Sequence, residues 1–277
     1  MFTIRELVQP ATLEEAYTIL TSKKMNTVLG GCLFLKMGSK RIGTAIDLSH
    51  PNLGLKGIIE HDEWFEIGAM TTFRELETYP ALQSFFQGVL PKSVSDIIGV
   101  QFRNGVTVGA SVFSKYGFSD LITVLLALDA EAELFHGGRK TLQEFLKQPY
   151  EKDILTKIWL RKNNRKAAYQ SLRNSASDYA VLNVAVSELE GQWRIVAGAR
   201  PQRAMLAERA SQELSERIRK DGAGILLDVQ IVVEIAELAA EELTFGTNMR
   251  ASAEYRQALC PVLVKRAIME VQQCESN

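Results

Sequence analysis

Two glycine-bearing segments carry residue types that could hold a phosphate-containing ligand. One is the Gly30-Gly31 pair, which follows the β-type residues 26–29, and the other runs over residues 99–120. Glycine lets the backbone approach a ligand closely or adopt positive φ, and backbone N–H groups at such turns bind anions. On chemistry alone, each segment is explained more simply as a tight turn beside a strand or a core helix.

The longer segment also contains a predicted helix start. Ser119 and Asp120 precede the apolar run 121–128, as a helix cap and a first-turn carboxylate do. Gly105 and Gly109 bracket a short β-type run. Backbone N–H groups, small side chains and a helix start therefore combine in one stretch, which favours phosphate binding.

The composition argues against several other chemistries. The chain has 277 residues and a formal net charge of -1, so no global field indicates nucleic acid or an anionic membrane surface as a partner. Its 3 cysteines are widely spaced and too few for a four-thiolate metal or iron-sulfur site, and we expect no metal on this chain. The longest apolar run is too short for a membrane span, and the first residues lack the pattern of a signal peptide. A cytoplasmic protein is therefore expected.

The elements that must position these segments follow from hydrophobic periodicity and capping patterns. Capping boxes that begin at Thr12, Thr72 and Thr141 indicate three helix starts. Helices are expected to dominate from residue 72 to residue 98. Strands are predicted over 26–29, 45–48, 55–60, 64–69, 130–135 and 154–160.

A charged, turn-like stretch over residues 161–166 is the best domain boundary that the composition offers. A hairpin with strands over 179–189 and 193–197 follows it. Helical periodicity continues over 205–219, 229–243 and 250–270, and the last of these is expected to break near Pro261.

Taken in order, these stretches resemble the FAD-binding subunit of the molybdenum hydroxylases, the family of xanthine dehydrogenase and of the medium subunit of carbon monoxide dehydrogenase. The resemblance extends from Pro10 to Arg256. The motifs that carry it are PATLEEA at 10–16, VLGGCLF at 28–34, AIDL at 45–48, EIGAMTT at 66–72, QFRNGVTVGAS at 101–111, LLALDA at 125–130 and RASAEYR at 250–256.

The resemblance implies an α+β fold. It consists of a two-part FAD-binding domain of the vanillyl-alcohol-oxidase type with mixed sheets, followed by a carboxy-terminal antiparallel sheet packed on helices. The implied domains are FAD-binding subdomain 1 over residues 1–54, FAD-binding subdomain 2 over 55–162 and a carboxy-terminal domain of the molybdenum hydroxylase flavoprotein type over 163–277.

The resemblance also assigns cofactor-binding residues. The first loop would place main-chain N–H groups on the FAD pyrophosphate, and the second would hold the cofactor from the opposite side. Asp120 matches a carboxylate that binds the cofactor, Leu155 matches a position against the flavin, and Gln170 matches a position where some relatives carry lysine. The residues of the two loops are Val28, Leu29, Gly30, Gly31, Cys32, Leu33 and Phe34, and Thr107, Gly109, Ala110 and Ser111.

Three departures from the family pattern predict weakened FAD binding. Cys32 and Leu33 stand where relatives usually have a hydroxyl residue followed by Asp, Glu or Ser, so a side-chain hydrogen bond to phosphate is lost or passes to the backbone. Ala110 replaces a glycine, which is costly only if the position needs positive φ. Gln170 keeps a hydrogen-bond donor but loses a charge.

The function implied by the resemblance is electron transfer without a catalytic acid or base on this chain. Electrons would pass from a molybdopterin-binding large subunit through a two-iron two-sulfur small subunit to FAD, and then to an acceptor such as NAD. The alternatives are a flavin-free scaffold or maturation partner with the same fold, and a stand-alone flavoprotein of the wider superfamily. The last would need a substrate pocket with convergent catalytic groups, which the carboxy-terminal sequence does not indicate.

Overall fold

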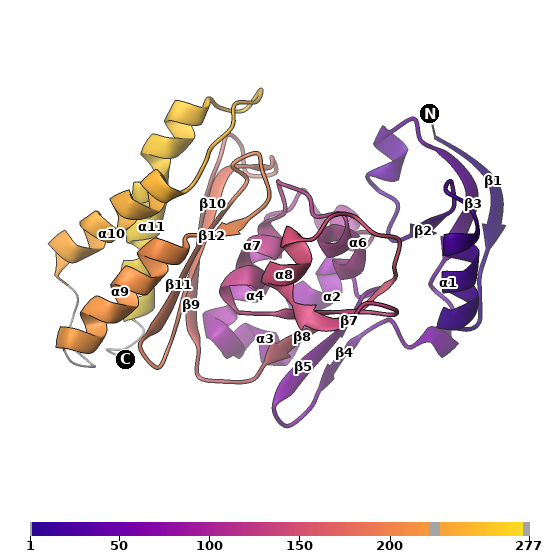
Figure 1. Ribbon diagram of the computed structural model, residues 1–277, viewed down its shortest axis with the longest axis horizontal. Coiled ribbons are helices and arrows are strands. Elements are labelled where there is room, and N and C mark those ends of the chain that lie inside the picture. The colour runs from indigo at the N-terminus through magenta and orange to yellow at the C-terminus, as the bar shows by residue number, and fades with distance from the viewer. Residues whose placement is uncertain (1, 222–227, 274–277) are drawn as a thin grey trace. The chain divides into compact units, whose positions relative to one another are not determined.

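The computed structural model describes residues 2–221 and 228–273, and Figure 1 shows its helices and strands. The chain forms two compact units. The first takes residues up to 76 together with 99–114 and 130–162, and the second takes 77–98, 115–129 and the residues from 163 onward. The chain thus passes between the units several times, and the domain limits at 54 and 162 stay predictions.

The first unit begins with a three-stranded parallel sheet in the order β1-β3-β2. Ile46 of the central strand packs with Ala16 and Leu20 of the helix that crosses the sheet. The predicted cap of this helix is confirmed, since Thr12 Oγ1 accepts the N–H of Glu15 at 3.2 Å. The elements are β1 (Thr3–Val8), α1 (Leu13–Ser22), β2 (Thr27–Leu29), η1 (Leu35–Met37), β3 (Arg41–Asp47) and η2 (Pro51–Leu53).

Strand β1 is an addition to the elements that the sequence predicted. It is an edge strand, and its residues are exposed apart from the half-buried Val8. Burial therefore imposes no alternation of polar and apolar residues on it, which is the pattern by which a strand is detected in a sequence.

A five-stranded antiparallel sheet, in the order β4-β5-β8-β6-β7, forms the rest of the first unit together with short helices. The capping box at Thr141 is confirmed, because its hydroxyl accepts the N–H of Glu144 and the Glu144 carboxylate accepts the N–H of Thr141. The elements are β4 (Ile58–Glu60), β5 (Trp64–Gly68), α5 (Val100–Arg103), α6 (Val108–Phe113), β6 (Glu131–Leu134), β7 (Gly138–Thr141), α8 (Leu142–Lys147) and β8 (Leu155–Arg161), while α2 (Phe73–Thr78) begins in this unit and ends in the second.

The second unit is a four-stranded antiparallel sheet, in the order β12-β11-β10-β9, with helices on both faces (Figure 1). Leu182, Val184 and Val186 of β10 face the helices α9 to α11, and Ser187 faces α7, where its hydroxyl donates to the Ala127 carbonyl. The elements are α3 (Pro80–Ser84), η3 (Phe85–Gly88), α4 (Val89–Ser95), α7 (Asp120–Ala127), β9 (Lys166–Arg173), β10 (Ala180–Leu189), β11 (Gln192–Gly198), β12 (Met205–Leu206), α9 (Glu208–Asp221), α10 (Val229–Glu242) and α11 (Ala253–Gln273).

The helix break expected near Pro261 is wrong, because α11 continues through that residue. Proline inside a helix removes one hydrogen bond and costs about 3 kcal/mol. Buried apolar residues on the following two turns, among them Leu263, Val264 and Ile268, belong to the core beneath the sheet, and their burial offsets that cost. Pro261 and Gln257 line an open groove, so water can reach the carbonyl that proline leaves without a donor.

Arg256 on α11 is fully buried, at 0% exposure, and bonds only to uncharged oxygens. Its guanidinium donates to the carbonyl oxygens of Val181, Gly246 and Ala251 and to Asn248 Oδ1, at distances from 2.6 to 2.8 Å. One side chain therefore joins the start of α11 to β10 and to the loop between the last two helices.

Among the described residues, no helix is long and apolar enough to span a bilayer.

Replacing Arg256 should destabilise the second unit strongly. We expect Arg256→Ala to lower the free energy of unfolding by about 3 kcal/mol, because a large buried side chain is lost and the buried carbonyl of Val181 and three less buried oxygens lose their donor. Urea unfolding followed by circular dichroism measures this change. Arg266→Ala, at an exposed position of the same helix, is the matched control and should stay within about 0.5 kcal/mol of the wild type. Equal losses in the two variants would contradict the bridging role of Arg256.

Candidate functional site

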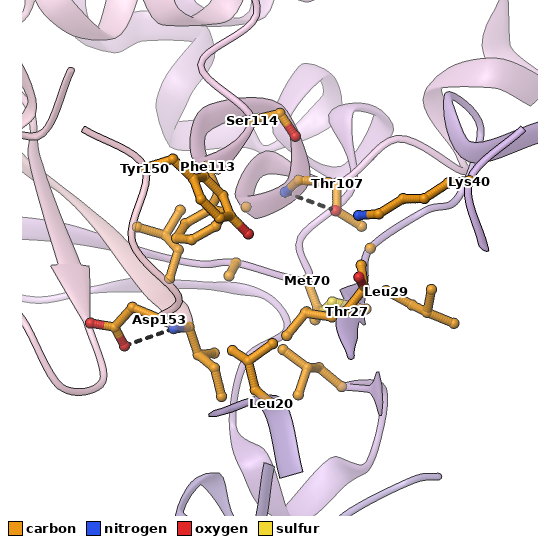
Figure 2. A pocket seen from close by; sticks show the side chains of 18 residues that line it. Leu20, Thr27, Leu29, Lys40, Met70, Thr107, Phe113, Ser114, Tyr150 and Asp153 are labelled. Atoms are coloured by element: carbon orange, nitrogen blue, oxygen red, sulfur yellow. Dashed lines mark hydrogen bonds between the residues drawn. The ribbon is translucent and has the colours of Figure 1, made fainter. Parts of the chain in front are cut away.

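A cavity of about 270 Å³ in the first unit brings parts of the two glycine loops together (Figure 2). Ligand pockets commonly have volumes of about 300 to 1,000 Å³, so this cavity lies just below that range and would enclose only part of a dinucleotide. The predicted site residues that line it are Val28, Leu29, Gly30, Thr107, Gly109, Ala110 and Leu155. Leucine and aromatic side chains supply much of the remaining wall.

The two loops touch through their main chains. A Cβ atom built on Gly31 would lie 1.3 Å from the carbonyl oxygen of Gly105. A Cβ atom built on Gly30 would lie 2.5 Å from the Cβ of Ala110 and 2.8 Å from Thr107 Oγ1. Any larger residue at either position would force the loops apart. The glycine pair is therefore required for loop-to-loop packing.

The first loop has backbone donors that the protein does not use. Among the residues that the structure describes, the N–H groups of Gly31, Cys32 and Leu33 have no hydrogen-bond acceptor. Cys32 has a φ of 61°, in the left-handed region, and its thiol donates to the Gly30 carbonyl at 3.2 Å. Successive free N–H groups around a left-handed residue form the kind of concavity that binds anions. Burial is the main cause that raises the pKa of the Cys32 thiol, which favours its protonated form.

The second loop has used most of its backbone donors. The N–H groups of Val108 and Gly109 donate to the carbonyls of Thr71 and Ala69, and those of Ala110 and Ser111 donate to Thr107. Thr107 is the N-cap of α6, so Ala110 lies in a helix and does not have positive φ. The alanine in place of glycine is therefore tolerated by the backbone. From residue 108 to residue 111, this loop can therefore contribute side chains and packing surface to a ligand, but not free N–H groups.

Five predicted residues of the first unit do not line the cavity: Gly31 and Cys32, described above, and Leu33, Phe34 and Ser111. The Leu33 side chain packs near Gly105, where a built Cβ would lie 3.2 Å from Leu33 Cδ1. Phe34 contacts Phe102 edge to face, with ring centroids 6.3 Å apart. Ser111 belongs to α6 and does not line the cavity. Leu33, at a position where the family usually has a polar residue, therefore contributes apolar packing between the two loops.

The remaining two predicted residues, Asp120 and Gln170, lie in the second unit. Asp120 is 2% exposed, and its carboxylate accepts hydrogen bonds from the Tyr169 hydroxyl at 2.7 Å, Asn183 Nδ2 at 2.5 Å and Arg173 at 2.9 Å. Burial first, and then the charge of Asp120, raise the pKa of Tyr169 well above its usual range. In this structure Asp120 is the centre of a buried polar network. Gln170 bonds to Glu270 on α11.

Sequence reasoning missed several residues of the cavity wall. Figure 2 shows Lys40 extending toward Thr107, with Phe113 and Tyr150 on another wall of the same cavity. The rings of Phe113 and Tyr150 meet edge to face, with centroids 5.6 Å apart. Asp153 also lines the cavity, and its carboxylate accepts the N–H groups of residues 136, 137 and 154. These residues come from segments far apart in the sequence, so no local pattern marks them as a group.

The fold and the loops define an FAD-binding domain followed by an antiparallel sheet covered by helices. Residues 2–163 match the family described as FAD binding domain in molybdopterin dehydrogenase. Residues 167–271 match the CO dehydrogenase flavoprotein C-terminal domain. The chain belongs to the family of FAD binding domains in molybdopterin dehydrogenases, and the resemblance and the fold class inferred from its motifs are confirmed.

Known proteins of similar sequence and structure extend over the whole chain. The nicotine 6-hydroxylase medium subunit of Paenarthrobacter nicotinovorans is 26% identical, with 94% of this chain and 95% of that protein covered. A putative xanthine dehydrogenase FAD-binding subunit of Escherichia coli is 25% identical, with 98% and 97% covered. The structure of quinoline 2-oxidoreductase from Pseudomonas putida 86 superposes with a TM-score of 0.84 at 21% identity, covering 99% of each chain.

The residues of the first loop fit a dinucleotide such as FAD. Free N–H groups beside a cavity suit a pyrophosphate, and the apolar wall suits a ring system. The described residues contain no group of three or more His, Cys, Asp or Glu side chains that could hold a metal ion.

Gly31→Ala should separate the two loops. Because a methyl group would overlap a backbone carbonyl, we expect the free energy of unfolding to fall by about 2 kcal/mol and FAD affinity to fall with it. Thermal unfolding and flavin titration measure the two effects. Gly38→Ala is the control, since a Cβ atom there meets nothing closer than 3.7 Å and φ is negative. A Gly31→Ala protein with wild-type stability would contradict the packing role of this glycine.

Asp120→Asn should destabilise the second unit because it leaves the Arg173 guanidinium, which is 9% exposed, without its counter-charge. We expect a loss of about 3 kcal/mol in the free energy of unfolding, measured in urea. Asp129→Asn is the control, because that carboxylate is 50% exposed and its loss should cost less than about 1 kcal/mol. If both variants unfold like the wild type, Asp120 does not hold the network together.

Proposed function

We propose that this chain is the FAD-binding electron-transfer subunit of a molybdenum-containing hydroxylase. The observation that carries the proposal is the run of N–H groups at Gly31, Cys32 and Leu33 that have no acceptor among the described residues, beside the cavity, in a chain whose residues 2–163 match the FAD-binding family. These donors are partly exposed, and an anionic ligand would satisfy them.

The first loop would hold the FAD pyrophosphate, and Thr107 and the apolar wall would contact the rest of the cofactor from the opposite side. When bound, FAD supplies the redox chemistry by accepting and passing on electrons. The chain's own residues bind the cofactor, orient it and exclude water from it. Leu155, at the start of β8, would lie against the flavin.

Partner subunits complete this proposed function. The 3 cysteines of the chain are too few to ligate an iron-sulfur cluster, so electrons would arrive from a small subunit with two-iron two-sulfur clusters. The substrate would be oxidised on a large molybdopterin-binding subunit. The medium-subunit relative from Paenarthrobacter nicotinovorans supports such an assembly, and NAD is the proposed final acceptor.

A second candidate function is a flavin-free scaffold or maturation partner. Two contacts favour it: the Leu33 side chain packs against the Gly105 region instead of offering a polar group, and the Ala110 methyl fills the space beside Gly30. Both changes make the loops pack together without a ligand. Cofactor binding decides between the two candidates.

The deciding measurement is the absorbance spectrum of the purified chain before and after addition of FAD, with bound flavin quantified after gel filtration. We expect about one FAD per chain, with an affinity that rises when Leu33→Asp and Ala110→Gly are combined. Gly38→Ala serves as a loop variant that should leave the affinity unchanged. A chain that stays colourless with added FAD, both alone and with its partner subunits, would favour the scaffold function instead.

A further inference from the structure

Lys40 is an unpaired cation at the edge of the cavity. Its side chain lines the cavity and extends toward Thr107 (Figure 2), and among the described residues of the wall it is the only lysine or arginine. Within the described part of the chain, its amine makes neither a hydrogen bond nor an ion pair. Other surface lysines of this unit do find carboxylates, as Lys157 does with Glu66 at 2.7 Å.

A second lysine increases the positive charge near Lys40. The Lys152 amine donates to the backbone carbonyl of Leu20 at 2.9 Å and also to that of Lys23. Burial first, and then the charge of Lys40, lower the pKa of Lys152. The two amines therefore lie close enough to repel each other, and an anion between or beside them would relieve that repulsion.

The carboxylates near the cavity are already occupied. Asp153 lines the wall but accepts three backbone N–H groups. Asp47, which lies near the first loop, accepts the N–H and the hydroxyl of Ser49. The local balance thus combines an unpaired amine, free N–H groups in the adjoining loop and carboxylates held by other donors. This combination favours a ligand with more than one negative charge.

We infer that Lys40 neutralises the pyrophosphate of the bound dinucleotide and replaces the polar side chain that this chain lacks at Leu33. The inference rests on the proposed FAD-binding function. The first loop supplies hydrogen bonds from its backbone, and Lys40, beside Thr107, supplies the charge (Figure 2). Its place next to Thr107 makes it specific for the phosphate part of FAD rather than for the flavin ring.

The test is the affinity of the full chain for FAD and for riboflavin, which has the same ring system without phosphate, measured by quenching of flavin fluorescence. Lys40→Met should weaken FAD binding roughly tenfold, because a charge-assisted contact is lost. Riboflavin affinity should change less than about twofold. Lys40→Arg should retain most of the FAD affinity, and raising the salt concentration should weaken FAD binding less in Lys40→Met than in the wild type.

Lys24→Met is the matched control, since it removes the same net charge at an exposed position outside the cavity wall. An FAD affinity of Lys40→Met equal to that of Lys24→Met would overturn the inference and leave the proposed function intact. Equal losses for FAD and riboflavin would also overturn it, because they would place Lys40 against the ring.

If the wild-type chain binds no FAD, the proposed function fails, and inorganic pyrophosphate becomes the probe. Isothermal titration of the wild type and of Lys40→Met then measures the anion site directly. Pyrophosphate binding that depends on Lys40 would support the anion site in the absence of flavin. Absence of pyrophosphate binding in the wild type would overturn the inference as well.

Discussion

The first unit depends on the close approach of main-chain segments that only glycine permits. Gly31 lies against the carbonyl of Gly105, Gly109 lies against Ala69, and Gly68 lies against Leu55. At each of these contacts, a neighbouring segment of the chain occupies the space that a side chain on the glycine would need. These contacts fix the spacing between the parallel sheet, α6 and the five-stranded sheet, and the cavity exists where that spacing leaves room.

Within this frame the two loops have different chemical roles. The N–H groups of Val108 to Ser111 in the second loop donate to Thr107 or to the carbonyls of Ala69 and Thr71, so this part of the loop is held by the protein itself. The first loop keeps its donors free because Cys32 turns the chain into the left-handed region. Rigid support on one side and unsatisfied donors on the other are what a preformed anion site requires.

The second unit buries charged and polar side chains. Its central strand β10 is covered on both faces, yet one face carries Asn183 and Ser187. These polar residues are satisfied by α7, where Thr123 Oγ1 donates to Asn183 Oδ1 at 2.9 Å, and by the network around Asp120. These buried hydrogen bonds favour one packing arrangement, since any slip of the strand would leave several groups unpaired.

The sequence by itself determined the family, the three capped helices and both glycine loops, because these depend on local patterns and on motif order. It did not determine that α11 continues through Pro261, that Ala110 needs no positive φ, or that Asp120 is enclosed by Tyr169, Asn183 and Arg173. Nor did it single out Lys40. Each of these is decided by contacts between residues distant in the chain, where burial and pairing outweigh local preference and only the tertiary structure fixes the partners.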